Sequence, residues 1–217
     1  MQINITDLRA LDGDVQQVAV HIRILSDEGQ QERSTYYVLP HQYAALRLRV
    51  GEIDTAKADA IEAAAQLCDA IRRGLSLLSY GAQSERTLCR KLQMRGIDAD
   101  VAQQAAAYLH GLGLMDESAD ARRIVVTCRR KRWGMRRILS HLFEKGYHES
   151  VIREIQQELE GEDFVPDCMA LIRTKYRGVP EDRNERQKMT AALMRYGYSI
   201  GEIRHAMERV AREDADE

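Results

Sequence analysis

Three stretches of the chain align with one another and decide its fold: LCRKLQMRGIDADVAQQAAAYL (88–109), ILSHLFEKGYHESVIREIQQEL (138–159) and MTAALMRYGYSIGEIRHAMERV (189–210). Each has a glycine at the same place, Gly96, Gly146 or Gly197, so the copies follow one another at intervals of 50 and 51 residues. Apolar residues recur around each glycine at helical spacings, and glycine favours the left-handed conformation that ends a helix. Each stretch is therefore predicted to be a helix, a short turn and a second helix.

A third helix is expected next to each of these pairs. The clearest candidates are residues 119–133, after the first pair, and residues 166–177, after the second. Three-helix units in series predict a mainly α protein, an elongated array in which each unit chiefly contacts its neighbours. The predicted divisions are an N-terminal region at 1–53, a linking helix at 54–80, helical repeats at 81–133, 134–180 and 181–212, and an acidic tail at 213–217.

The N-terminal region has a different pattern. In VQQVAVHIRIL (15–25) apolar residues alternate with others, which is typical of a half-buried strand. TYYVL (35–39) is rich in β-branched and aromatic residues and ends at Pro40, so it is the expected partner strand. The sequence thus predicts a small antiparallel β-hairpin. Too few strands are visible for an independent sheet, so the hairpin is expected to pack on the helices that follow.

Composition and motifs exclude several classes of protein. The chain has 217 residues and no apolar run of the roughly 18–20 residues that span a membrane. Its first residues, MQINITDLRALDGD, lack the features of a secretory signal. The cysteines (Cys68, Cys89, Cys128 and Cys168) form no CxxC pair, so reduced thiols in a cytoplasmic protein are expected. Without a histidine cluster, a phosphate-binding glycine loop or a nucleophile motif, no metal, cofactor or enzymatic activity is predicted.

Positive charge is concentrated in the middle of the chain. Residues 122–145 hold nine Lys or Arg against Glu144 alone, whereas the whole chain has a net charge of −2. Acidic residues gather nearby at 149–163 and in the tail. Such segregation favours a surface for a polyanion. The candidate contact residues are Arg122, Arg123, Arg129, Arg130, Lys131, Arg132, Arg136, Arg137 and Lys145, extended by Lys91 and Arg95.

Blander interpretations stay open for these residues. The cations could form a solvated helix face or be neutralised by the acidic segment at 149–163. Trp133 is the only candidate near the basic stretch for stacking on bases, and core or hinge packing is expected for it instead. Tyr147 and Tyr198, each directly after a repeat glycine, are expected in the core. Asp116 and Glu117 are expected to cap the helix that follows them.

Several of these stretches resemble the RecX family of bacterial recombinase regulators. The resemblance covers roughly residues 75–210 and lies in the segments LLSYGAQSERTLCRKLQMRGID, GLMDESADARRIVV and GMRRILSHLFEKGY. The matching residues are Ser84, Glu85, Leu88, Lys91, Leu92, Gly96, Asp116, Glu117, Gly134, Arg137, Ile138, Leu142, Lys145 and Gly146. Asp120 and His141 depart from the family pattern, where an aromatic residue and a glutamate are usual.

The resemblance implies a monomeric, non-enzymatic regulator in DNA repair, recombination and the SOS response. Such a protein would bind the RecA–DNA filament, lie along its groove, and lower the ATPase and strand-exchange activities of the recombinase. Contacts with DNA would be weak, salt-sensitive and mainly to phosphate. Two alternatives remain: a DNA-binding helix-turn-helix protein without a recombinase partner, and a protein-interaction array that ignores nucleic acid.

Overall fold

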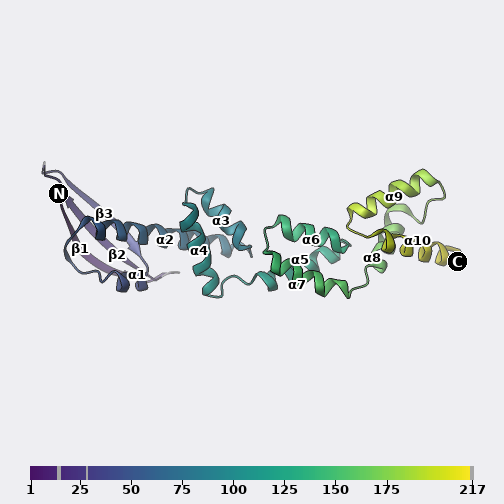
Figure 1. The fold of residues 1–217 in the computed structure, drawn as a ribbon, viewed down its shortest axis with the longest axis horizontal. Coiled ribbons are helices and arrows are strands. Elements are labelled where there is room, and N and C mark those ends of the chain that lie inside the picture. Colours follow the sequence, from purple (N-terminus) through teal and green to yellow (C-terminus); the bar gives the residue numbers. More distant parts are fainter. Residues whose placement is uncertain (14–15, 28, 216–217) are drawn as a thin grey trace. The chain divides into compact units, whose positions relative to one another are not determined.

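The computed structural model describes residues 1–13, 16–27 and 29–215, and the chain forms two compact units, Met1–Met115 (unit 1) and Asp116–Glu217 (unit 2) (Figure 1). Residue 15 of the predicted first strand and residues 216–217 of the predicted tail lie outside the described residues. The strands are β1 (Gln2–Leu11), β2 (Gln17–Leu25), β3 (Gln31–Val38) and β4 (Gly51–Ile53). The helices are α1 (Pro40–Ala45), α2 (Thr55–Ser79), α3 (Glu85–Gln93), α4 (Ala99–Gly111), α5 (Glu117–Arg130), α6 (Met135–Glu144), α7 (Glu149–Glu160), α8 (Val165–Tyr176), α9 (Arg183–Arg195) and α10 (Ile200–Ala215).

The N-terminal region is a four-stranded antiparallel sheet in the order β3-β2-β1-β4. The predicted hairpin is its β2–β3 pair, aligned from Val18 opposite Val38 to Leu25 opposite Gln31. Two further strands join it that the sequence did not predict. The pairing of β1 with β2 shifts register between Ile5 and Asp7, which interrupts the alternation that marks a strand, and β4 has only three residues.

Helix α2 connects the sheet to the first repeat. The Asp54 side chain accepts a hydrogen bond from the Lys57 amide at 2.7 Å, so Asp54 is the N-cap of α2. The first half of α2 packs on the sheet through Ile61 and Ala64. Its second half packs on α3 and α4 in a separate apolar cluster that includes Ile71. The expected packing of strands against the following helices is therefore confirmed, with one long helix serving both cores.

The three repeat turns share one hydrogen-bonding pattern. The glycines Gly96, Gly146 and Gly197 have φ of +83°, +77° and +98°, a conformation that other residues adopt only with strain. After each glycine, the next amide donates to the carbonyl of the leucine at the end of the preceding helix, at 3.2 Å (Ile97–Leu92), 3.2 Å (Tyr147–Leu142) and 3.3 Å (Tyr198–Leu193). This is the Schellman closure of a helix, and it confirms the predicted helix-turn-helix in all three stretches.

Each helix pair packs with the helix before it. Helix α2 contacts α3 and α4, and α5 contacts α6 and α7. In the third group α10 contacts both α8 and α9. The sequence instead assigned the helix at 119–133 to the first repeat, because the repeat period fixes the pairs but not the side on which the third helix packs. In the structure Ala121 and Cys128 of α5 are buried in the same cluster as Ile138 and Leu142 of α6.

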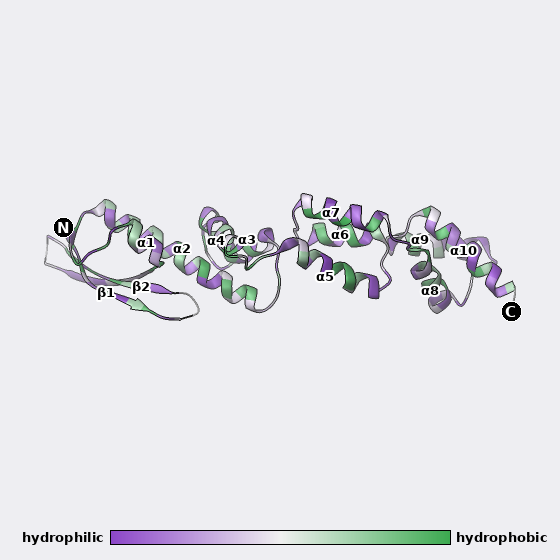
Figure 2. Ribbon diagram, turned by 90° about the horizontal axis from the view of Figure 1, so that it is seen from below, coloured by the Kyte–Doolittle hydropathy of each residue, from purple (hydrophilic) through white to green (hydrophobic). Residues whose placement is uncertain are grey.

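The helices of unit 2 carry both hydrophobic and hydrophilic residues, as helices with one buried face do (Figure 2). Tyr147 and Tyr198 lie in its core as predicted, with 6% and 0% of their surfaces exposed. All four cysteines are free thiols, and Cys89 alone of them is partly exposed. Within the described ranges, no helix is both long and apolar enough to cross a membrane.

Candidate anion-binding surface

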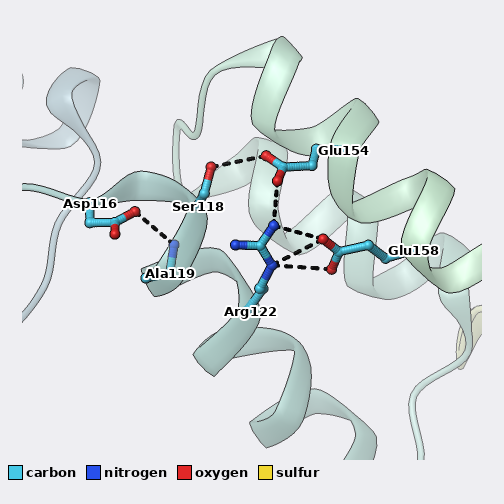
Figure 3. Close-up of polar contacts among 6 residues, drawn as sticks. All are labelled: Asp116, Ser118, Ala119, Arg122, Glu154 and Glu158. Carbon is cyan, nitrogen blue, oxygen red and sulfur yellow. Dashed lines mark hydrogen bonds and ion pairs between the residues drawn. The ribbon is translucent and has the colours of Figure 1, made fainter.

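The basic residues of α5 fall into two groups, and the first group is neutralised within unit 2. Arg122 lies between two glutamates of α7, Glu154 and Glu158, and donates to both (Figure 3). Its contact with Glu158 Oε1 is 2.7 Å long. The hydrogen bond from Arg122 lowers the pKa of Glu158 below its ordinary value. The acidic segment thus compensates this cation within the fold, as the sequence left open.

Arg123 and Arg129 are neutralised in the same way. Arg123 lies 2.7 Å from Asp120, one turn earlier on α5. Burial raises the pKa of Asp120, and the guanidinium opposes that shift. Arg129 lies 3.2 Å from Asp167 on α8 and stacks on the Phe164 ring, 4.0 Å from its centroid. Arg129 therefore connects α5 to α8, whereas the Arg123 ion pair lies within α5.

The acidic residues that precede α5 have structural roles. Asp116 is its N-cap and accepts a hydrogen bond from the Ala119 amide at 2.9 Å (Figure 3). Glu117 accepts one from the amide of His148, the N-cap of α7, at 3.1 Å. The predicted capping role is confirmed for Asp116, whereas Glu117 serves the start of a different helix.

Arg132 is a structural residue at the end of α5. It has φ of +55°, the left-handed conformation that follows a helix end. Its guanidinium donates to the carbonyl of Ala170 at 3.2 Å and to Thr174 Oγ1 at 3.3 Å, both on α8. Its own carbonyl accepts a hydrogen bond of 2.8 Å from the buried hydroxyl of Tyr198. Arg132 therefore connects the end of α5 to α8 and to Tyr198, which lies between α9 and α10.

The second helix pair (α6 and α7) and the third (α9 and α10) come into backbone contact at Gly134 and Gly197. The Gly134 amide donates to the Tyr196 carbonyl at 2.8 Å, and the Arg136 amide donates to the Gly197 carbonyl at 3.2 Å. A Cβ atom at Gly134 would lie 2.5 Å from the carbonyl carbon and oxygen of Gly197. The backbones approach so closely that neither glycine leaves room for a side chain.

Next to this junction lies a group of cations and rings that we call the Trp133 cluster: Lys131, Trp133, Arg137, Lys175 and Tyr196. The Arg137 guanidinium lies 4.1 Å from the Trp133 ring centroid and 5.2 Å from that of Tyr196. Lys131 Nζ lies 5.5 Å from the Trp133 centroid, and Lys175 Nζ lies 4.4 Å from the Tyr196 centroid. The cluster thus joins side chains from the end of α5, from α6, from α8 and from the end of α9.

The charge of the Trp133 cluster is uncompensated. No carboxylate in the described parts of the chain lies within 4.0 Å of the charged nitrogens of its three cations. His141 meets the edge of the Trp133 ring, with 5.3 Å between centroids. Its pKa is lowered, first by burial and then by the positive charges of Lys145, Lys131 and Arg137, against Glu144, which raises it. The cluster is therefore a region of positive potential.

The remaining predicted cations divide between the two units. Arg130 and Arg136 are exposed in unit 2, and neither has a carboxylate within ion-pair distance among the described residues. Lys145 is also exposed. Lys91 and Arg95 belong to unit 1, on α3 and directly after it, and the Arg95 carbonyl accepts a hydrogen bond from Arg73.

Sequence reasoning missed Lys175 and Tyr196. Lys175 lies outside the basic stretch, and Tyr196 occupies the position before the repeat glycine where the other copies have Arg95 and Lys145. Only the packing of the third pair on the second brings them to Trp133. Trp133 itself packs against the core of unit 2 as predicted, and its ring also makes a cation–π contact with Arg137.

The surface has the chemistry of an anion-binding site. Ammonium and guanidinium groups bind phosphate or carboxylate, and arginine binds either in bidentate fashion. The described residues include no group of three or more His, Cys, Asp or Glu side chains able to hold a metal ion.

Comparison with known proteins gives consistent matches. The family model for RecX, first three-helix domain, matches residues 70–109, and that for RecX, third three-helix domain, matches residues 167–207. The chain is 31% identical to regulatory protein RecX of Xanthomonas campestris pv. campestris (strain B100) over 137 residues, which are 63% of this chain and 84% of the relative. It is 26% identical to regulatory protein RecX of Clostridioides difficile (strain 630) over 145 residues, 65% of this chain and 68% of the relative. A crystal structure of regulatory protein RecX has the same fold, with a TM-score of 0.74 at 22% identity over 95% of this chain and 99% of that one.

Proposed function

This chain belongs to the RecX family of regulatory proteins, and from that premise we propose that it binds the RecA–DNA filament and lowers the ATPase and strand-exchange activities of the recombinase. It acts as a binding protein in the cytoplasm, without catalysis of its own. By this proposal it is a monomer that works in DNA repair, recombination and the SOS response. Its three helix groups would serve as a scaffold that presents charged side chains to the filament.

The observation that carries the proposal is the uncompensated positive charge on unit 2 of a chain from a regulatory family. Cations without carboxylate partners gather at the end of α5 and the start of α6, whereas Arg122, Arg123 and Arg129 are neutralised on α5. A filament of protein on DNA offers both phosphates and acidic side chains to such a surface. We assign the filament contact to the Trp133 cluster together with Arg130 and Arg136. We include Lys145 because it is exposed at the end of α6.

The test is the single-stranded-DNA-dependent ATPase rate of the host RecA, titrated with this protein at low and moderate salt. The proposal predicts inhibition well below one copy per recombinase monomer, because one bound copy blocks several subunits of a filament. Weaker inhibition is expected at moderate salt, where charge contacts are screened. An ATPase rate that stays constant up to a large excess of this protein would contradict the proposal.

The same titration separates the alternative of a helix-turn-helix protein that reads duplex DNA. That function requires a sequence-specific footprint on naked duplex and leaves the ATPase rate unchanged. The filament proposal predicts weak, salt-labile duplex binding without a footprint.

A further inference from the structure

The aromatic rings of the Trp133 cluster are already covered by cations. Arg137 lies over Trp133 and approaches Tyr196, while Lys131 and Lys175 cover Trp133 and Tyr196 respectively. Lys175 also donates to the Tyr196 hydroxyl. A nucleic-acid base could stack on a ring face that a cation occupies only by displacing that cation. The rings therefore act as supports that orient ammonium and guanidinium groups through cation–π attraction.

The cations on these rings differ in their partners from the cations of unit 2 that form ion pairs. Arg122, Arg123, Arg129 and Arg173 each contact a carboxylate within the fold. The three cations of the cluster contact rings instead, so their charge remains available to a ligand. Cations that have no carboxylate within ion-pair distance among the described residues fit a polyanion better than a protein surface, where charges of both signs are mixed.

The frame around the cluster is rigid. Backbone hydrogen bonds connect Gly134 to Tyr196 and Arg136 to Gly197, and the Tyr198 hydroxyl connects to Arg132. Trp133 lies between Arg132 and Gly134, and Tyr196 directly precedes Gly197. These bonds hold together the two segments that carry the rings before any ligand binds, which reduces the entropy lost on binding.

We propose that the Trp133 cluster binds the sugar–phosphate backbone of single-stranded nucleic acid and does not stack on its bases. This rests on the proposed function, since it specifies which component of the filament the surface contacts. Phosphate oxygens would lie between the Arg137 guanidinium and the ammonium groups of Lys131 and Lys175. The neighbouring Arg130 and Arg136 would extend the contact to further phosphates.

Two properties of oligonucleotide binding by the full chain test this proposal, and neither experiment contains recombinase. The first compares a 20-nucleotide oligo(dT) with an abasic oligomer of the same length, using the fluorescence of Trp133, the only tryptophan of the chain. We expect affinities within about twofold of each other. Stacking on even one ring would weaken abasic binding by roughly tenfold, since one stacked base contributes about 1–3 kcal/mol.

The second property is the salt dependence of oligo(dT) binding for two double variants. K131Q/K175Q removes two cluster cations, and R122Q/R153Q removes two cations that contact glutamates, so both change the net charge equally. Each phosphate contact on a single strand contributes about 0.7 to the slope of log K against log salt, so K131Q/K175Q should lose about 1.4. R122Q/R153Q should keep the wild-type slope.

Three results would overturn the proposal. Tenfold weaker binding of the abasic oligomer would mean that the rings stack on bases. Equal slopes for the two double variants would place the phosphate contacts elsewhere. If the wild-type chain binds neither oligomer, the ligand of the cluster would instead be acidic side chains of a protein. In each of these cases the ATPase of the recombinase is measured as well. If this protein still inhibits it, the proposed function holds and only this inference fails.

Discussion

Replacing Gly134 by alanine should open the junction between the second and third helix pairs. Gly134 has φ −74° and ψ 162°, which alanine adopts without strain, so any effect comes from the added methyl group. That group would lie 2.5 Å from the Gly197 carbonyl carbon and oxygen and 2.7 Å from the Tyr198 nitrogen. All three are backbone atoms, which cannot move aside as a flexible side chain can.

The expected loss of stability follows from these contacts. Overpacking of this kind costs about 1–3 kcal/mol. Separation of the backbones also removes two hydrogen bonds, from Gly134 to Tyr196 and from Arg136 to Gly197, at about 1 kcal/mol each. G134A should therefore lower the free energy of unfolding of unit 2 by about 3–5 kcal/mol. With a urea m-value of about 1–3 kcal/mol/M, the unfolding midpoint should fall by roughly 1–5 M.

Trp133 lies one residue from the substitution, so its fluorescence in a urea titration reports on this unit. The matched control is G201A in α10, where a Cβ atom would meet only Ser199 Oγ, at 3.9 Å. G201A should keep or slightly raise the midpoint, because alanine is the better helix former by about 1 kcal/mol. A G134A midpoint equal to that of the wild type would refute the close packing of the two backbones.

Three further predictions concern single side chains. Y198F should destabilise unit 2 by about 1–3 kcal/mol in the same urea titration, because the buried carbonyl of Arg132 loses its donor; an unchanged midpoint would mean that water or another donor replaces the hydroxyl. D54A should lower the stability of unit 1 by about 1 kcal/mol, measured by circular dichroism in urea, because α2 loses its N-cap, and D54N should retain most of it. Oligo(dT) binding should raise the lowered pKa of His141 in an NMR titration, since a nearby phosphate favours the imidazolium. Affinity should then increase as the pH falls toward the lowered pKa of the free chain, and H141N should lose that increase.

The repeat could be predicted because its physical cause is local. A glycine that ends a helix and an apolar residue that folds back on that helix leave the same trace in each of the three copies. The cap Asp116 could be predicted for the same reason. Strand β1 could not, since its polar second half, after the register shift at Ile5, carries no clear alternation.

The candidate site was harder to predict, because charge in a sequence does not say which cations find partners. Arg122 and Arg137 look alike in the basic stretch. Only the packing of α7 beside α5 places two glutamates on Arg122, and only the third helix pair brings Tyr196 to Arg137. Contacts between residues more than thirty positions apart decided which part of the basic stretch stays uncompensated.

The most direct test of the account is the inhibition of RecA ATPase on single-stranded DNA by three forms of the chain. We predict that wild type and R122Q/R153Q inhibit with the same midpoint, and that K131Q/K175Q needs about tenfold more protein at low salt. Inhibition by K131Q/K175Q at the wild-type midpoint would contradict the assignment of the filament contact to the Trp133 cluster.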